Sequence, residues 1–184
     1  MKTYKVLSAL LCYPEPELLA ATDEMAAALK REQVLPERSR EAVLGRIRGL
    51  KEMDLLELQQ EYVALFDRGP ALSLHLFEHL YGDSRERGQA MVDLLELYRQ
   101  HGFEMNAREL PDYLPLFLEY LSQRPEAEAR DLLAGFGQVL ALLAARLAER
   151  GSDYRHVLEV LADLACQRPG IGRGARSARE RPAG

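Results

Sequence analysis

Hydrophobic positions recur every three or four residues along most of the chain, which is the spacing of one face of an α-helix. Pro, Gly, Asp and Ser, the residues that begin and end helices, separate these stretches. We predict helices over about 3–12, 17–32, 36–50, 54–66, 73–81, 84–101, 112–122, 126–149 and 152–166. No fixed-period repeat joins them. The predicted fold is therefore all-α, a single-domain globular bundle of about eight or nine helices.

Composition supports a helical fold and excludes two other classes. The chain has 184 residues, with 34 Leu and 23 Ala against 8 Val, 2 Ile and 2 Thr. Leu and Ala lose little entropy in a helix, whereas β-branched residues favour strands, so a sheet protein is not expected. The longest run without a polar residue or Gly is Val139–Ala145. A membrane-spanning helix needs about 20 apolar residues, so we predict no membrane insertion.

Charge divides the chain into an acidic body and a basic tail. Residues 167–184 carry a net charge of +4 and are rich in Arg and Gly, while the rest of the chain carries −9. We expect an all-helical domain over 1–166 and a disordered tail over 167–184. An acidic body argues against nucleic-acid binding and favours a basic partner. An alternative role for the tail, as an anion-binding or nucleic-acid-binding arm, stays open.

Cysteine usage indicates the compartment. Cys12 and Cys166 form neither a disulfide framework nor a zinc knuckle, which fits a reducing compartment. Lys2 and Lys5 precede an apolar stretch ending at Cys12, as in a lipoprotein signal, but Leu10 and Leu11, directly before the cysteine, are not the small residues that a cleavage site needs. We therefore predict an amphipathic first helix and a cytoplasmic protein.

One short motif predicts a different chemistry. The segment His75-Leu-Phe-Glu78-His79 has the H-x-x-E-H spacing of inverted zinc peptidases. On a helix these three side chains share one face, so two imidazoles could hold Zn²⁺ beside a carboxylate base. The alternative to a non-enzymatic protein is therefore a zinc-dependent hydrolase. A hydrolase also needs a third protein ligand, which the sequence does not identify; the other interpretation is a polar helix face.

The segment 112–122 is apolar on nearly every side, and Asp112 can cap it. It is either a central buried helix or a helix with one face in the core and a second lining a groove. A groove with aromatic and acidic side chains suits a basic amphipathic helix of a partner. The candidate peptide-binding residues are Tyr62, Phe66, His75, Glu78, His79, Glu109, Asp112, Tyr113, Glu119 and Tyr120. Tyr62 and Phe66 equally suit the core.

Three segments, in combination and order, carry a family resemblance. They are Tyr62-Val-Ala-Leu-Phe66-Asp-Arg-Gly69, Ser73-Leu-His-Leu-Phe-Glu-His79, and Arg108-Glu-Leu-Pro-Asp112-Tyr with Leu118-Glu-Tyr120. Over roughly 1–166 the chain resembles the respiratory nitrate reductase assembly chaperones of the TorD/DmsD family. The wider family has a Glu-x-Pro-Asp-His signature. Here Tyr113 replaces the histidine, which puts any role of that imidazole in doubt.

The resemblance implies a non-enzymatic, cytoplasmic chaperone with an all-helical fold. Such proteins bind the N-terminal peptide of the catalytic (alpha) subunit of an unassembled molybdoenzyme, here expected to be nitrate reductase. They hold no prosthetic group themselves and assist insertion of a molybdenum cofactor into the client. We expect a monomer or weak dimer, and a peptide that folds to a helix on binding.

Overall fold

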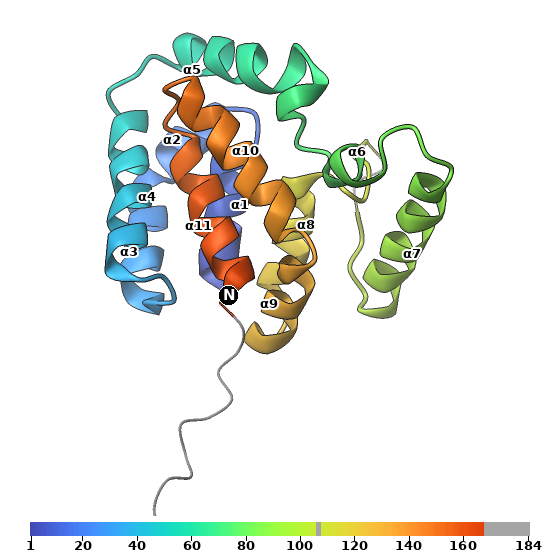
Figure 1. Cartoon of the computed structure of the whole chain (residues 1–184). Helices are drawn as coiled ribbons and strands as arrows, with labels where there is room; N and C mark the ends of the chain where they lie inside the picture. The colour runs from blue at the N-terminus through green and yellow to red at the C-terminus, as the bar shows by residue number, and fades with distance from the viewer. Residues whose placement is uncertain (106–107, 168–184) are drawn as a thin grey trace, which may run out of the picture.

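The computed structural model describes residues 1–105 and 108–167, in which eleven α-helices and two short helical turns are present without any β-strand (Figure 1). The α-helices are α1 Lys2–Leu11, α2 Pro16–Ala20, α3 Thr22–Glu32, α4 Glu37–Leu50, α5 Leu55–Tyr62, α6 Leu76–Tyr81, α7 Glu86–Gln100, α8 Leu114–Ser122, α9 Glu126–Ala134, α10 Gly137–Glu149 and α11 Arg155–Cys166. A π-helical turn, η1 (Val63–Asp67), continues α5, and a 3₁₀ turn, η2 (Pro70–Leu72), follows. The all-α prediction is confirmed. Of the predicted disordered tail, 167–184, only Gln167 lies within the described residues.

Helix α1 lies at the centre of the bundle, where it packs against α3, α8 and α11. Its side chains Tyr4, Leu7 and Leu11 are fully buried. The hydroxyl of Ser8, also buried, donates a hydrogen bond of 2.7 Å to the carbonyl of Pro115 on α8. A buried hydroxyl without such a partner would cost stability, so this bond helps to fix α8 against α1.

Two of the predicted helices are each broken into two, which raises the number of α-helices to eleven. The predicted helix 17–32 breaks at Ala21, where the Thr22 hydroxyl donates to the Leu19 carbonyl at 2.8 Å and competes with the helical ladder. The predicted helix 126–149 breaks between Ala134 and Gly137, and the two parts, α9 and α10, differ in direction by 71°. As a pair these parts satisfy the length and composition of a membrane span, which no single helix among the described residues does.

The start of α10 approaches α11 closely at Gly137, where a Cβ atom would lie 3.4 Å from the Cβ of Ala165. Overpacking such a contact typically costs about 1–3 kcal/mol. We therefore expect Gly137→Leu to lower the free energy of unfolding by about 2 kcal/mol in urea denaturation. The matched control is Gly88→Leu on α7, where nothing lies within 4 Å of the added Cβ. An equal effect at both glycines would contradict the close approach.

Helices α6 and α7 form an arm beside the bundle, on the right in Figure 1. Only Leu94 and Tyr98 of α7 are buried. The Tyr98 hydroxyl donates to the Pro111 carbonyl at 2.8 Å and so ties α7 to the segment that leads back to α8. That segment meets the chain before α6 through an isolated antiparallel bridge between His75 and Tyr113. Residues far apart in sequence are thereby brought together beside the end of α1.

Candidate functional site

A hollow of about 350 Å³ lies where η1, the segment before α6 and the segment before α8 meet. It is lined by Tyr13, Tyr62, Phe66, Asp67, Ser73, Leu74, His75, Glu109 and Tyr113. We call it the aromatic pocket. It contains five of the ten predicted peptide-binding residues, and a sixth, Asp112, lies directly behind it because its carboxylate contacts His75. Six of the predicted residues thus lie at or directly behind one concave surface, and their role in peptide binding stays a prediction.

The wall of the aromatic pocket is a run of rings in mutual contact. The Tyr62 ring lies 5.6 Å from Tyr13 and 4.9 Å from Phe66, measured between centroids. The π-helical turn η1 contains Phe66 and follows Tyr62 directly, and π-helical turns are often found at functional sites. Tyr62 and Phe66 are 4% and 7% exposed, so both belong mainly to the core and only their edges reach the hollow.

Two tyrosine hydroxyl groups form a hydrogen-bonded pair in this wall. Tyr62 donates to the Leu11 carbonyl at 3.1 Å and therefore accepts from Tyr113, whose hydroxyl lies 3.0 Å away. Burial raises the pKa of Tyr62 far above its usual 10 and raises the pKa of Tyr113 to about 12. Both phenols are thus uncharged near neutral pH. The negative charge of the pocket comes from Asp67 and Glu109, which are exposed.

The aromatic wall has a rigid backing around Arg46, which is only 4% exposed. Its guanidinium lies 4.2 Å from the centre of the Tyr154 ring, and one of its nitrogens is 3.7 Å from a carboxylate oxygen of Glu61. Tyr154 in turn packs its ring edge-to-face with Phe66 at 5.1 Å. Arg46 on α4 thus stacks on Tyr154, the residue before α11, and Tyr154 packs against Phe66, so Phe66 is held against these two elements.

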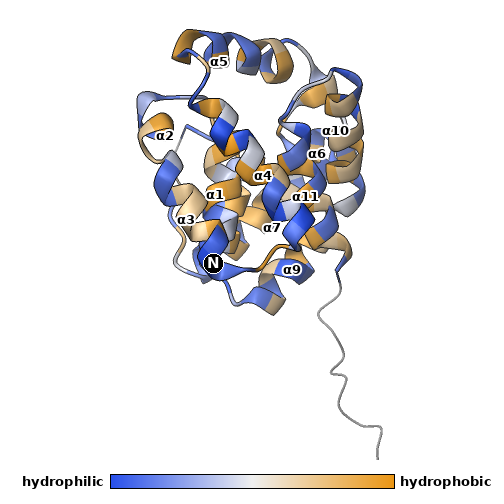
Figure 2. Ribbon diagram, turned by 90° about the vertical axis from the view of Figure 1, so that its left-hand side faces the viewer, coloured by the Kyte–Doolittle hydropathy of each residue, from blue (hydrophilic) through white to orange (hydrophobic). Residues whose placement is uncertain are grey.

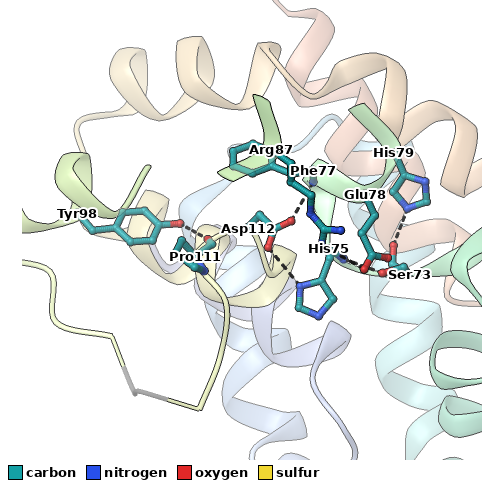
Figure 3. A network of polar contacts seen from close by, with 9 residues as sticks. All are labelled: Ser73, His75, Phe77, Glu78, His79, Arg87, Tyr98, Pro111 and Asp112. Atoms are coloured by element: carbon teal, nitrogen blue, oxygen red, sulfur yellow. Dashed lines mark hydrogen bonds and ion pairs between the residues drawn. The ribbon is translucent and has the colours of Figure 1, made fainter. Parts of the chain in front are cut away.

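Asp112 connects the pocket to α6 (Figure 3). The carboxylate is fully buried; one oxygen accepts from the Phe77 backbone N–H at 3.0 Å, and the other lies 3.3 Å from Nδ1 of His75. Its backbone carbonyl accepts from the Leu76 N–H at 3.0 Å. The predicted cap of α8 is therefore wrong: α8 begins only at Leu114, and Asp112 satisfies the free N–H groups at the start of α6 instead.

The contact with Asp112 makes the contribution of His75 to stability depend on pH. The hydrogen bond to the Asp112 carboxylate raises the pKa of His75 above its usual 6.5, with burial acting in the opposite direction. A raised histidine pKa contributes stability that is fully present below pH 6.5 and is lost as the pH rises through the folded-state pKa. We expect unfolding free energies to fall more for the wild type than for His75→Gln as the pH rises above 6.5. Parallel pH profiles from urea denaturation of the two proteins would contradict this role.

Two of the predicted residues on α6 face other partners. Glu78 pairs with Arg87 on α7, with 3.3 Å between oxygen and nitrogen. Nε2 of His79 forms a hydrogen bond of 2.8 Å with the carbonyl of Ser73. These contacts brace the arm, and neither side chain lines the aromatic pocket.

The two predicted residues on α8 also lie outside the pocket. Glu119 is exposed and borders a separate hollow that includes Gly102 and Phe103. Tyr120 is fully buried, and its hydroxyl lies 2.6 Å from Nδ1 of His101. Tyr120 is therefore a core residue and not a surface anchor, in agreement with the interpretation of 112–122 as a central buried helix.

The geometry does not support the zinc-hydrolase alternative. His75 precedes α6 as its N-cap residue, and Figure 3 shows its ring and that of His79 pointing toward different partners. In the part of the chain that the structure describes, no three His, Cys, Asp or Glu side chains are grouped closely enough to hold a metal ion. The third ligand that such a site needs is not in place there.

The structure adds Tyr13 and Asp67, two pocket residues that the sequence analysis did not select. Tyr13 follows the end of α1, is 40% exposed, and contacts the Tyr62 ring edge-on. Two features of the sequence could have indicated them as candidates. Tyr13 is a large aromatic residue between the end of a predicted helix and Pro14, and Asp67 is an acidic residue directly after Phe66, where the predicted helix 54–66 ends. Their joint position depends on contacts between the end of α1 and the end of α5, such as the hydrogen bond from the Tyr62 hydroxyl to the Leu11 carbonyl, which local patterns do not reveal.

The chain is similar in sequence to a known protein family over most of its length. The model of the nitrate reductase delta subunit family matches residues 15–164. The nitrate reductase molybdenum cofactor assembly chaperone NarJ of Escherichia coli K12 is 49% identical over 160 residues, which is 87% of this chain and 68% of that protein. The probable chaperone NarW of the same strain is 42% identical, over 90% of this chain and 68% of NarW.

A more distant relative and a solved structure extend the comparison. The probable NarJ chaperone of Bacillus subtilis is 31% identical over 86% of this chain and 85% of its own length. The crystal structure of a redox enzyme maturation protein from Archaeoglobus fulgidus has a TM-score of 0.59 with 22% identity, and the match covers 87% of this chain and 90% of that one. The similarity to this crystal structure supports the all-helical fold of the chain.

Proposed function

This chain belongs to the nitrate reductase delta subunit family, and from that premise we propose that its aromatic pocket binds the N-terminal peptide of the nitrate reductase catalytic (alpha) subunit. Like its relatives, the chain is a nitrate reductase molybdenum cofactor assembly chaperone and not an enzyme. The observation that carries the proposal is the pocket itself, which combines contacting aromatic rings with two exposed carboxylates.

The chemistry of the pocket suits a basic peptide with apolar side chains. Asp67 and Glu109 attract a peptide amino terminus or a basic side chain and accelerate the encounter. The edges of Tyr13, Phe66 and Tyr113 offer apolar contacts with little conformational entropy to lose. Because the peptide has to become ordered on binding, its affinity stays moderate, as release to the assembled enzyme requires.

The chaperone role involves the molybdenum cofactor as cargo of the client. In this proposal the chain holds the client in a form that accepts the cofactor and carries no prosthetic group of its own. The action takes place in the cytoplasm, and the chaperone works as a monomer or weak dimer. The chaperone binds the peptide and the client binds the cofactor, which fits a pocket with room for a few side chains of a peptide.

Calorimetric titration tests the proposal. The full chain is titrated with a synthetic peptide of the first ~15–30 residues of the nitrate reductase alpha subunit from the same organism. We expect one-to-one binding that weakens as ionic strength rises from low to physiological, because exposed charges are screened over about 8–10 Å. The absence of binding at every salt concentration would overturn the proposal.

A further inference from the structure

A second and larger hollow of about 650 Å³ runs along α1 beside α2 and α3. Its apolar lining includes Val6 and Ala9 of α1, Leu18 and Ala21 at α2, and Met25 and Ala28 of α3. We call it the α1–α3 groove. Figure 2 views this side of the molecule and shows hydrophobic residues along α1 and α3. The aromatic pocket does not account for this surface, because Tyr13 is the only described residue that lines both hollows.

The two ends of the α1–α3 groove carry opposite charges. The two helices run antiparallel, because the carboxylate of Glu32 at the end of α3 accepts the backbone N–H of Lys2 at the start of α1 at 2.6 Å. One end of the groove is therefore lined by Lys2 and Lys5. The opposite end is lined by Glu15, Glu17 and Glu24, which are all exposed.

Tyr13 joins the acidic end of the groove to the aromatic pocket. Its side chain lines both hollows, and its ring packs against Tyr62 at 5.6 Å. A single chain can thus pass from the pocket over Tyr13 into the groove. The carboxylates of Asp67 and Glu109 lie on the pocket side of Tyr13, and those of Glu15, Glu17 and Glu24 lie on the groove side. Negative charge therefore flanks Tyr13 on both sides.

We propose that the α1–α3 groove binds the helical segment that follows the pocket-bound residues in the client's N-terminal peptide, with that helix antiparallel to α1. This inference rests on the proposed function and deepens it. A helix has a partial positive charge at its N-terminus and a partial negative charge at its C-terminus. The acidic end beside Tyr13 therefore favours the start of the client helix, and Lys2 and Lys5 favour its end.

The dimensions and lining of the groove define the occupant. α1 has ten residues and so is about 15 Å long, which corresponds to a client helix of about three turns. Ala9, Ala21 and Ala28 keep the groove open because their side chains are short. Burial raises the pKa of the Cys12 thiol to about 11, so this side chain of the lining is uncharged near neutral pH. We expect an amphipathic segment with one apolar stripe and basic side chains in its first turn.

Peptides of two lengths test the groove separately from the pocket. One peptide covers the first ~8 residues of the alpha subunit and the other the first ~25, which is long enough for three further helical turns. Ala9→Gln places a longer polar side chain in the groove, and we expect it to weaken binding of the long peptide about tenfold while leaving the short one unchanged. Ala27→Gln, on an exposed part of α3 outside the groove, is the matched control.

The outcomes distinguish this inference from the proposed function. Equal affinities of Ala9→Gln and Ala27→Gln for the long peptide would overturn the proposal that the groove binds the client helix. The proposal that the aromatic pocket binds the peptide would still stand. If the wild-type chain binds neither peptide, the proposed function itself fails, and the groove with it. A photo-crosslinker tests the direction: placed in the first helical turn it should label residues near Tyr13, and in the last turn residues near Lys5. The reverse labelling would overturn the antiparallel orientation.

Discussion

Replacing Asp112 with alanine is expected to lower the free energy of unfolding by about 3 kcal/mol. The carboxylate is fully buried and bonds both the Phe77 N–H and the His75 ring. Its removal leaves a backbone donor at the start of α6 without a partner, and a buried unsatisfied donor alone costs about 1–3 kcal/mol. Urea denaturation followed by far-ultraviolet circular dichroism measures the change.

Two further variants show whether this effect comes from the carboxylate. Asp112→Asn keeps an oxygen for the Phe77 N–H, so we expect a smaller loss than with alanine. Asp93→Ala, at an exposed position of α7, should change stability by no more than about 0.5 kcal/mol. A loss for Asp112→Ala as small as that of Asp93→Ala would show that α6 does not depend on this cap.

Reversing the two pocket charges, with Asp67→Lys and Glu109→Lys together, is expected to weaken binding of the client peptide about a hundredfold at low salt. Both side chains are exposed, so the fold should be retained. A tenfold effect corresponds to about 1.4 kcal/mol, and each reversal replaces an attraction by a repulsion. Calorimetry with the long client peptide, at low and at physiological salt, measures the affinity.

A matched control separates local charge from net charge. Asp93→Lys with Glu96→Lys makes the same change in net charge on α7, away from the aromatic pocket. We expect a far smaller loss of affinity for this pair, because exposed charges more than about 10 Å away are screened. Equal losses in the two double variants would indicate attraction by the whole acidic body and would argue against the pocket.

Helix positions were predictable from the sequence to the extent that local signals determine them. The start of the predicted helix 54–66 is an example. Asp54 lies directly before α5, and its carboxylate accepts the Leu56 N–H at 3.0 Å as the local rule for helix caps requires. The break at Ala21 was not predicted, because the hydrophobic stripe continues through it. The break between α9 and α10 had a signal in the sequence, since Gly135 and Gly137, inside the predicted helix 126–149, allow a bend or a close helix approach. Asp112 shows most clearly where local rules fail. They predict that Asp112 caps the helix that follows it, but in the folded chain its carboxylate accepts the N–H of Phe77, 35 residues away at the start of α6.

The candidate site was predictable only in part for the same reason. Aromatic and acidic residues were visible in the sequence, but which of them share a surface depends on packing. Tyr120 looked equivalent to Tyr113 on the pattern, yet it is fully buried while Tyr113 borders the pocket. A helix that is apolar on nearly all sides, such as α8, gives no periodicity from which its exposed face could be identified. Tyr13 was missed because its neighbours in the pocket come from distant parts of the chain.

Nuclear magnetic resonance can show directly where the client peptide binds on the chain. The isotope-labelled full chain is titrated with the N-terminal peptide of the alpha subunit, and the backbone amide shifts are followed residue by residue. We expect the largest changes around Tyr13, Phe66 and Tyr113 and along the α1–α3 groove. Changes confined to α7, or to the hollow beside Glu119, would place the client elsewhere and contradict it.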